Sequence, residues 1–335
     1  MSIDTGHIAL NGPVMGTRWS AVFRAPEGAD IAAIRAALAA SVEEVDRQMS
    51  TWNPASDLMR LNDAAPGVWI ALPRGLMAVL KAGLEVGRAS GGAFDIALGD
   101  LTNAWGFGPQ PADATAMRKK LGKPHLPAHE MLELDETTGK ARKRAPLTLD
   151  LSGIAKGYGV DRMMAVLQRF GIENGLVGLD GELRANGCRA DGSPWTIAVE
   201  RPDYEARAPM SILALEDAAV ATSGDYRHWV EIGGRRLSHT MDRRRGGPVA
   251  NPLASVSVVA GTCMEADAWA TALMVAGAED GVTLARDNRL NALFIERRGT
   301  DLAQISVGPL FEDNGAPAGH VPDRTAARAD HHGRH

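Results

Sequence analysis

Residues 150–161 combine a glycine turn with a lysine at the start of an expected helix. An apolar strand is expected to end at Asp150, the chain turns on Gly153, and Lys156 follows where the helix opens. Turn amides, the positive end of a helix and an ammonium group together form a site suited to phosphate. Taken alone, the segment slightly favours the plainer alternative, an ordinary strand-to-helix connection with Lys156 in solvent.

Residues 262–271 place a carboxylate and a hydroxyl on one helix face. Thr262 and Glu265 fit the capping-box pattern S/T-x-x-E, which assigns Glu265 a structural role. Asp267 and Thr271 are four residues apart and share a helix face, and both are hard oxygen donors that suit Mg²⁺ rather than Zn²⁺. In isolation, the segment is better explained by an Asp satisfied by a nearby donor and a Thr bonded to its own backbone.

A third set of polar residues lies in 222–226 and 238–242, separated by two expected strands. It includes Ser223 and His239, and an imidazole titrates in the range that suits a proton acceptor near neutral pH. Asp242 follows three residues later and would orient His239. The alternative is a hydrogen-bonded structural histidine in a strand.

Two aromatic residues stand beside polar side chains at expected helix ends, Trp52 in 50–53 and Phe94 in 92–95. An isoalloxazine or adenine ring would stack on such a residue. Core packing explains each of the two singly.

The common catalytic and nucleotide-binding motifs are absent from the sequence. There is no G-x-G-x-x-G fingerprint, and the segment around Gly153 lacks the spacing of the P-loop motif G-x-x-x-x-G-K-[ST]. G-x-S-x-G, H-E-x-x-H and D-x-[DN]-x-[DN]-G are also missing, so the readily recognised hydrolases, zincins and EF-hands are excluded.

Apolar periodicity predicts the elements that must position these side chains. Asp30 is expected to cap the clearest amphipathic helix, and Pro73 to occupy the first position of the next. The expected helices span 30–49, 73–90, 115–121, 157–170 and 264–275. The expected strands span 17–24, 147–151, 175–179, 195–199, 212–216, 228–232, 254–260, 291–296 and 303–307.

The composition is that of a soluble globular protein. In 335 residues, 45% are apolar and 23% charged, which argues against a wholly disordered or fibrous chain. The net charge of -5 gives no electrostatic footprint for a nucleic acid, so that class of partner is excluded. Cys188 and Cys263 lie far apart and outside any C-x-x-C, which predicts buried small side chains rather than a disulfide or a thiolate metal site.

The sequence shows no run of 18 apolar residues and no apolar signal region in its first thirty residues. As written, it predicts a cytoplasmic protein. Residues 1–7 are expected to form a leader. Residues 313–335 hold four of the nine His and no aromatic residue, which predicts a disordered tail.

The order of the polar and aromatic motifs resembles the FAD:protein FMN transferases of the ApbE family. Each motif is weak alone, but eight in the family's order outweigh the separate structural alternatives. The motifs are Met15-Gly16-Thr17, Met49-Ser50-Thr51-Trp52, Gly92-Ala93-Phe94-Asp95, Trp105-Gly106-Phe107-Gly108, residues 150–161, 222–226, 239–242 and 266–271.

The resemblance implies an α+β fold with two lobes, mixed but mainly antiparallel sheets, and a flavin site between the lobes. It implies one catalytic domain over 8–312. It further implies Mg²⁺-dependent transfer of the FMN moiety of FAD onto a Thr or Ser hydroxyl of an acceptor protein, with release of AMP. The acceptor would be a membrane redox subunit, and family members usually work in the periplasm, so an export segment would then be missing here.

Site residues follow from the resemblance position by position. His239 is the expected base, with Asp267 and Lys156 as further catalytic residues. The expected metal ligands are Gly153 through its carbonyl, Asp267 and Thr271. The expected FAD contacts are Met15, Trp52, Ala93, Phe94, Asp95, Asp150, Lys156, Ser223 and Met241.

The chain departs from the family pattern at two places. Similar sequences often carry Tyr at the position of Trp52, which would keep the stacking and lose a phenolic hydrogen bond. They usually have Pro after Asp242 and Thr before the following Gly, where this chain has Arg243, Arg244 and Arg245. These arginines would meet an acidic acceptor or the FAD pyrophosphate.

Two alternatives to the transferase stay open. An FAD pyrophosphatase would use the same metal site with water in place of the acceptor hydroxyl. A non-catalytic flavin-binding module would need the stacking residues alone, and the presence of Asp267, Thr271 and His239 argues for an enzyme. Monomer and dimer are not distinguished.

Overall fold

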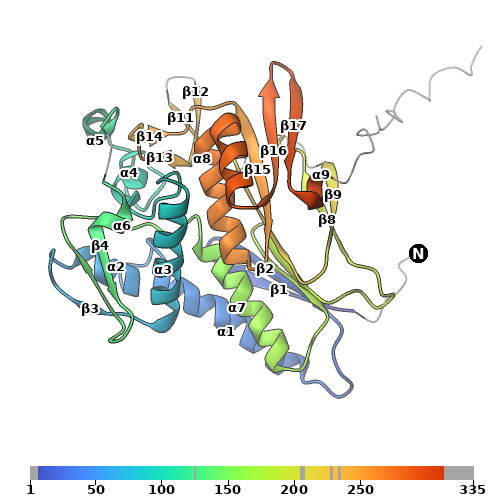
Figure 1. Ribbon diagram of the computed structural model, residues 1–335. Coiled ribbons are helices and arrows are strands. Elements are labelled where there is room, and N and C mark those ends of the chain that lie inside the picture. Colours follow the sequence, from blue (N-terminus) through green and yellow to red (C-terminus); the bar gives the residue numbers. More distant parts are fainter. Residues whose placement is uncertain (1–6, 124–125, 204–207, 227–228, 233–234, 313–335) are drawn as a thin grey trace, which may run out of the picture.

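The computed structural model describes residues 7–123, 126–203, 208–226, 229–232 and 235–312 (Figure 1). The expected tail at 313–335 and all but the last residue of the expected leader lie outside the described residues. Within the described residues, no helix combines the length and apolar character needed to cross a membrane.

An eight-stranded sheet forms the centre of the fold, and each pair of neighbouring strands in it is antiparallel. This arrangement confirms the α+β class with mainly antiparallel sheets. The strand order is β1 (Ile8–Val14), β2 (Thr17–Phe23), β6 (Gly175–Leu179), β7 (Glu182–Asn186), β10 (Ala219–Gly224), β15 (Leu253–Ala260), β16 (Asn291–Arg298) and β17 (Asp301–Val307).

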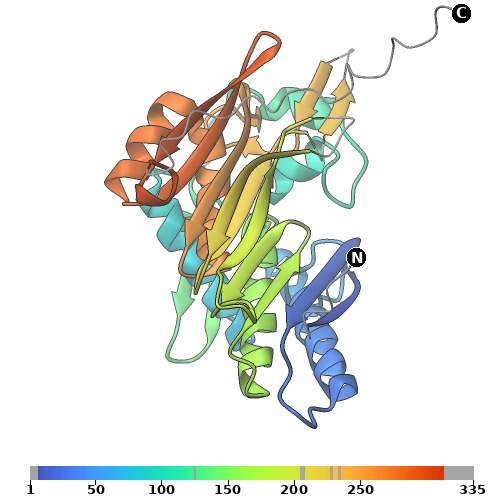
Figure 2. The ribbon, with the colours of Figure 1, turned by 90° about the vertical axis from the view of Figure 1, so that its right-hand side faces the viewer.

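Helices cover one face of this sheet and a two-stranded ribbon covers the other (Figures 1 and 2). Alternate residues of a strand point to opposite faces. In β10, Ala219 accordingly belongs to the core beneath the helices, whereas Val220 joins the core beneath the ribbon. The helical layer contains α1 (Ile31–Met49), α7 (Ala155–Arg169) and α8 (Cys263–Asp287), and the ribbon consists of β8 (Trp195–Glu200) and β9 (Pro209–Leu215).

The remaining elements lie around the helical layer and the sheet edges (Figure 1). The helices are α2 (Asp57–Asp63), α3 (Arg74–Ala89), α4 (Gly99–Ala104), α5 (Ala114–Lys120), α6 (Ala128–Met131) and α9 (Pro309–Glu312). The small sheets pair β3 (Ile70–Ala71) and β4 (Leu132–Asp135) with β5 (Lys140–Lys143), β11 (Trp229–Ile232) with β12 (Arg235–Ser238), and β13 (Met241–Asp242) with β14 (Gly247–Pro248).

Most of the expected helices are confirmed. Asp30 caps α1 by accepting a hydrogen bond from the Ala33 amide. Pro73 caps α3 from outside the helix, so the prediction that it occupies the first helical position is wrong by one residue. The expected end of α8 at residue 275 is also wrong, because the helix resumes after Gly277, whose φ of 81° forms a kink, and continues to Asp287.

The strand expected at 147–151 is wrong. Leu149 is fully buried, but its backbone groups bind the side-chain amide of Asn62. The Asp150 amide donates to the Ile96 carbonyl, and the Gly99 amide to that of Thr148. The segment therefore satisfies its hydrogen bonds with a side chain of α2, the first amide of α4 and the Ile96 carbonyl instead of with a neighbouring strand. Three strands of the central sheet, β1, β7 and β10, were not expected from the sequence. Of the two cysteines, Cys263 is buried as expected and Cys188 is only partly buried.

Candidate active site

Two hairpin tips meet at one edge of the candidate site. Met15 and Gly16 join β1 to β2, and Asp180 and Gly181 join β6 to β7, all four with positive φ. Such two-residue turns match the twist of the paired strands. The Thr17 hydroxyl donates to Asp180 Oδ1 at 2.9 Å, which ties the two tips together. Met15 is partly buried and packs against two of the core clusters.

Lys156, in the first turn of α7, points toward this edge. Its Nζ lies 2.7 Å from Glu182 Oε1 and 3.3 Å from Asp180 Oδ2. Burial alone would lower the pKa of Lys156, but the carboxylates of Glu182, Asp267 and Asp180 together raise it well above its ordinary value. The alternative that leaves Lys156 in solvent is therefore wrong, because its side chain is 28% exposed and fully charged between two carboxylates.

The N-termini of α7 and α8 cap each other. Asp161 of α7 accepts hydrogen bonds from the Cys263 and Met264 amides at the start of α8, and Asp267 of α8 accepts one from the Gly157 amide at 3.0 Å. The helices can approach this closely because residue 157 is glycine, where a Cβ would stand 2.3 Å from the Cys263 carbonyl oxygen. Each carboxylate satisfies first-turn amides of the other helix.

Asp267 is a buried acid with a strongly raised pKa. Burial raises its pKa to about 7, and Glu182 acts in the same direction, while Lys156 and the Gly157 amide oppose the shift. The alternative of an Asp satisfied by a nearby donor is thus correct for one carboxylate oxygen, Oδ2. Because the carboxyl group is 4% exposed, a bound cation would favour its ionised form.

The three expected metal ligands lie on two adjoining segments, the turn before α7 and the N-terminal half of α8. Thr271 lies one turn after Asp267 on α8, and its Oγ1 is 3.1 Å from the hydroxyl of Ser223 on β10. Gly153 packs directly against Thr271, since a Cβ at 153 would lie 3.0 Å from Thr271 Oγ1. Among the residues that the structure describes, there is no cluster of three or more His, Cys, Asp or Glu that would hold a metal. A carboxylate with neutral oxygens nonetheless fits the preferences of Mg²⁺. We call Lys156, Asp161, Asp180, Glu182, Asp267 and Thr271 the helix-pair centre.

The segment 91–95 forms a second side of the candidate site, next to the helix-pair centre. The Asp150 amide donates to the Ile96 carbonyl, and Asp150 Oδ1 accepts from the amide of Ser152 at 2.9 Å, so this segment adjoins the turn at Gly153. Asp95 Oδ1 accepts from the amides of Ala97 and Ala128, and its Oδ2 lies 3.4 Å from Arg243 Nε.

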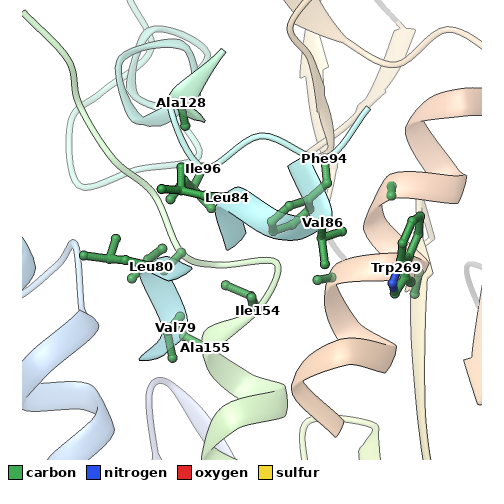
Figure 3. Packing of buried hydrophobic residues seen from close by; sticks show 14 of the residues in the cluster. Val79, Leu80, Leu84, Val86, Phe94, Ile96, Ala128, Ile154, Ala155 and Trp269 are labelled. Carbon is green, nitrogen blue, oxygen red and sulfur yellow. The ribbon is translucent and has the colours of Figure 1, made fainter. Parts of the chain in front are cut away.

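The two expected stacking residues differ in exposure. Phe94 is 3% exposed, and Figure 3 shows its ring beside Val86 in the core cluster that also holds Trp269. Its side chain therefore packs in the core, and a contact with FAD would involve its backbone. Trp52 is 67% exposed just after α1, which leaves its ring accessible to a ligand.

His239 follows β12, and its ring packs edge-on against Phe107 with the centroids 6.3 Å apart. Asp242 accepts hydrogen bonds from the amides of Arg244 and Arg245, so its observed contacts stabilise the loop. That Asp242 orients His239 stays a prediction. Met241 is buried with Leu98, Leu101, Ala104 and Trp105.

A cavity of about 360 Å³ adjoins this region. Its lining includes Ser238, next to His239, and Met274, three residues beyond Thr271 on α8. None of the described residues that line it is an expected site residue.

Three partners at the helix-pair centre were not expected from the sequence: Asp161 as a cap, Asp180 and Glu182. The pair Asp180-Gly181 directly follows an expected strand, and Asp-Gly is a strong hairpin signal that would have placed this tip. No local signal connects Glu182 to Lys156, because they lie 26 residues apart and meet only through the packing of α7 on the sheet.

Comparisons with known proteins identify the family of the chain. A model of the ApbE family matches residues 15–294. The FAD:protein FMN transferase of Vibrio cholerae serotype O1 is 37% identical over 86% of this chain and 87% of its own length, and that of Escherichia coli K12 is 32% identical over 90% and 88%.

Solved structures give the same result. The flavin transferase ApbE from Vibrio cholerae superimposes with a TM-score of 0.82 at 34% identity, covering 92% of this chain and 98% of the other. The apo flavinyl transferase ApbE of Pseudomonas stutzeri gives 0.80 at 34% identity, covering 90% and 94%. The chain therefore belongs to the ApbE family.

Proposed function

We propose that the chain is an FAD:protein FMN transferase that moves the FMN moiety of FAD onto a Thr or Ser hydroxyl of an acceptor protein and releases AMP, with Mg²⁺ at the site. Support for the transferase comes from its relatives, which carry this name over most of the chain's length. The observation that carries the proposal is that Thr271, one turn after Asp267 on α8, packs against Gly153, while Asp267 binds the Gly157 amide next to Lys156.

The residues of the helix-pair centre suit a pyrophosphate. In phosphoryl transfer, charge neutralisation and an in-line nucleophile matter more than covalent help from the protein. Asp267, Thr271 and the Gly153 carbonyl would hold Mg²⁺, which when bound neutralises charge on the pyrophosphate oxygens. Lys156 and the first-turn amides of α7 add fixed positive potential. Glu182 holds the Lys156 ammonium in place.

The transfer reaction needs a base that accepts the proton of the acceptor hydroxyl. The acceptor oxygen forms a bond to the FMN phosphorus, the bond from that phosphorus to the bridging oxygen breaks, and AMP departs with that oxygen. The acceptor hydroxyl proton goes to His239, whose imidazole suits that role near neutral pH. Met15, Trp52, Ala93, Asp95, Asp150, Ser223 and Met241, together with the Phe94 backbone, would contact FAD.

The test of the reaction is incubation with FAD, Mg²⁺ and purified candidate acceptor proteins, including redox subunits of membrane complexes, followed by mass spectrometry. Covalent FMN on a Thr or Ser of the acceptor supports the proposal. Free FMN and AMP without a modified acceptor indicate a pyrophosphatase, and unchanged FAD indicates a binding protein. Fractionation of native cells with N-terminal sequencing decides between the cytoplasmic and periplasmic alternatives.

The role of His239 is tested separately. We expect His239→Ala to lower the rate of flavin transfer by about 100-fold or more and to leave FAD affinity close to that of the wild type. His7→Ala is the matched control, because His7 packs against Trp195 of the β8–β9 ribbon, away from the helical layer. Transfer at the wild-type rate by His239→Ala would rule out His239 as the base.

A further inference from the structure

The arginine loop that departs from the family pattern docks onto the segment 91–95. Arg243 Nε lies 3.4 Å from Asp95 Oδ2, and the two side chains are 15% and 1% exposed. The next residue, Arg244, donates from Nη2 to the Gly91 carbonyl at 3.4 Å. We call the contact between 91–95 and 239–246 the loop junction.

The backbone of 91–95 is shaped to receive Arg243. Gly92 has a φ of 80°, and a Cβ there would lie 2.7 Å from Arg243 Nη2 and 3.2 Å from its Nε. A side chain at residue 92 would therefore be strained by its backbone conformation and would also displace the guanidinium. The Arg243 guanidinium thus occupies space that only a glycine at residue 92 leaves open.

Asp95 is held from two sides. Its Oδ1 accepts the amides of Ala97 at 2.9 Å and Ala128 at 3.1 Å, and Arg243 lies against its Oδ2. A buried carboxylate is costly unless it is paired with a cation, and removal of one partner leaves an uncompensated charge. The ion pair with Arg243 thus adds to the two amides in holding Asp95, and like them it favours the ionised carboxylate against the burial that raises the pKa of this group.

We infer that Arg243 is a positioning residue that shapes the flavin side of the FAD site by holding Asp95 and by joining the segment 91–95 to the loop that follows His239. This inference rests on the proposed function, in which Asp95 contacts FAD. Arg243 acts through Asp95 and is not a catalytic residue.

Binding of FMN and of AMP to the Mg²⁺-supplemented protein provides the test, with no acceptor present. Asp95 follows Phe94 in the segment that is expected to contact the flavin. Arg243→Gln should therefore raise the Kd for FMN about tenfold and leave the Kd for AMP unchanged. Arg243→Lys, which keeps the charge, should restore part of the FMN affinity. Arg169→Ala is the matched control, since this exposed arginine lies in the last turn of α7, at the end of the helix opposite Lys156, and its variant should bind FMN as the wild type does.

A double-mutant cycle separates positioning from general destabilisation. In the background of Asp95→Asn, Arg243→Gln should weaken FMN binding no further, because its partner is already neutral. An equal loss of FMN affinity in both backgrounds, or a parallel loss of AMP affinity, would overturn the inference. Wild-type protein that binds FMN and AMP but never modifies an acceptor would refute the transferase while leaving the role of Arg243 supported. Unchanged FMN affinity in Arg243→Gln would refute the role of Arg243 while leaving the transferase intact.

Discussion

The helix-pair centre and the loop junction hold their charged groups in different ways. In the centre, Asp161 and Asp267 bind first-turn amides of the opposite helix, and Lys156 lies between two carboxylates. At the junction, the Arg243–Asp95 ion pair and one hydrogen bond from Arg244 to the Gly91 carbonyl link the two segments. The centre is built on regular elements with several mutually supporting contacts, whereas the junction depends on single side chains.

The difference matches the chemistry proposed for each region. A metal and a pyrophosphate need ligands whose positions are set within fractions of an ångström, and side chains on rigid helices provide that. The loop junction tolerates sequence change more easily, because loops vary without disturbing the elements they connect. Mutations in the centre should therefore cost more than mutations at the loop-borne side of the site.

The largest effect is expected from Asp267→Asn, which keeps an acceptor for the Gly157 amide and removes the charge. Flavin transfer should fall about 100- to 1,000-fold, and the rate should lose its dependence on Mg²⁺ concentration. Rates measured across a Mg²⁺ titration, with EDTA as the metal-free reference, test this. A variant that keeps wild-type transfer and its Mg²⁺ response would show that Asp267 is only a helix cap.

Asp161→Ala should lower stability more than any other single change proposed for the centre. It removes the acceptor of two α8 amides and leaves Arg184, whose Nη1 lies 2.6 Å from the carboxylate, without this partner. We expect a loss of about 3 kcal/mol in the free energy of unfolding, measured by urea denaturation. Asp280→Ala, an exposed position of the same helix, should change stability by less than about 0.5 kcal/mol. Similar losses in both variants would contradict the reciprocal capping.

Gly277→Ala tests whether the distal half of α8 is independent of the centre. Its φ of 81° and ψ of 178° are accessible almost only to glycine, so alanine should cost about 2 kcal/mol in unfolding free energy. Transfer by the folded protein should remain normal, because the kink lies beyond Thr271. Gly261→Ala, where a Cβ meets nothing within 4 Å and φ is not positive, is the control with little expected loss. A large loss of transfer in Gly277→Ala would show that the kink positions the site.

The smallest effect is expected at Trp52, on the loop-borne side of the site. Trp52→Ala should raise the Kd for FAD about tenfold, and Trp52→Tyr should keep most of the affinity because stacking is retained. Fluorescence titration measures both. Trp69→Ala is the control, since that partly exposed ring instead stacks under Arg142 at 4.6 Å. Equal losses from Trp52→Ala and Trp69→Ala would argue against a specific stacking role.

Local signals predicted the elements well where they were strong. The period of apolar residues and the caps at Asp30 and Thr262 located α1 and the start of α8. They failed at 147–151, where an apolar run is buried without a strand because Asn62 supplies its hydrogen bonds. Burial and strand formation leave the same apolar pattern, so periodicity could not separate them.

The sequence by itself determined the amphipathic helices, the shared face of Asp267 and Thr271, and the order of motifs that indicates the family. Only the tertiary structure decided that Asp161 and Asp267 cap each other's helices, that Glu182 pairs with Lys156, and that Arg243 pairs with Asp95. The residues of these pairs lie from 26 to more than 100 positions apart. Contacts of this kind depend on sheet register and helix packing, which set distances through space that no local propensity encodes.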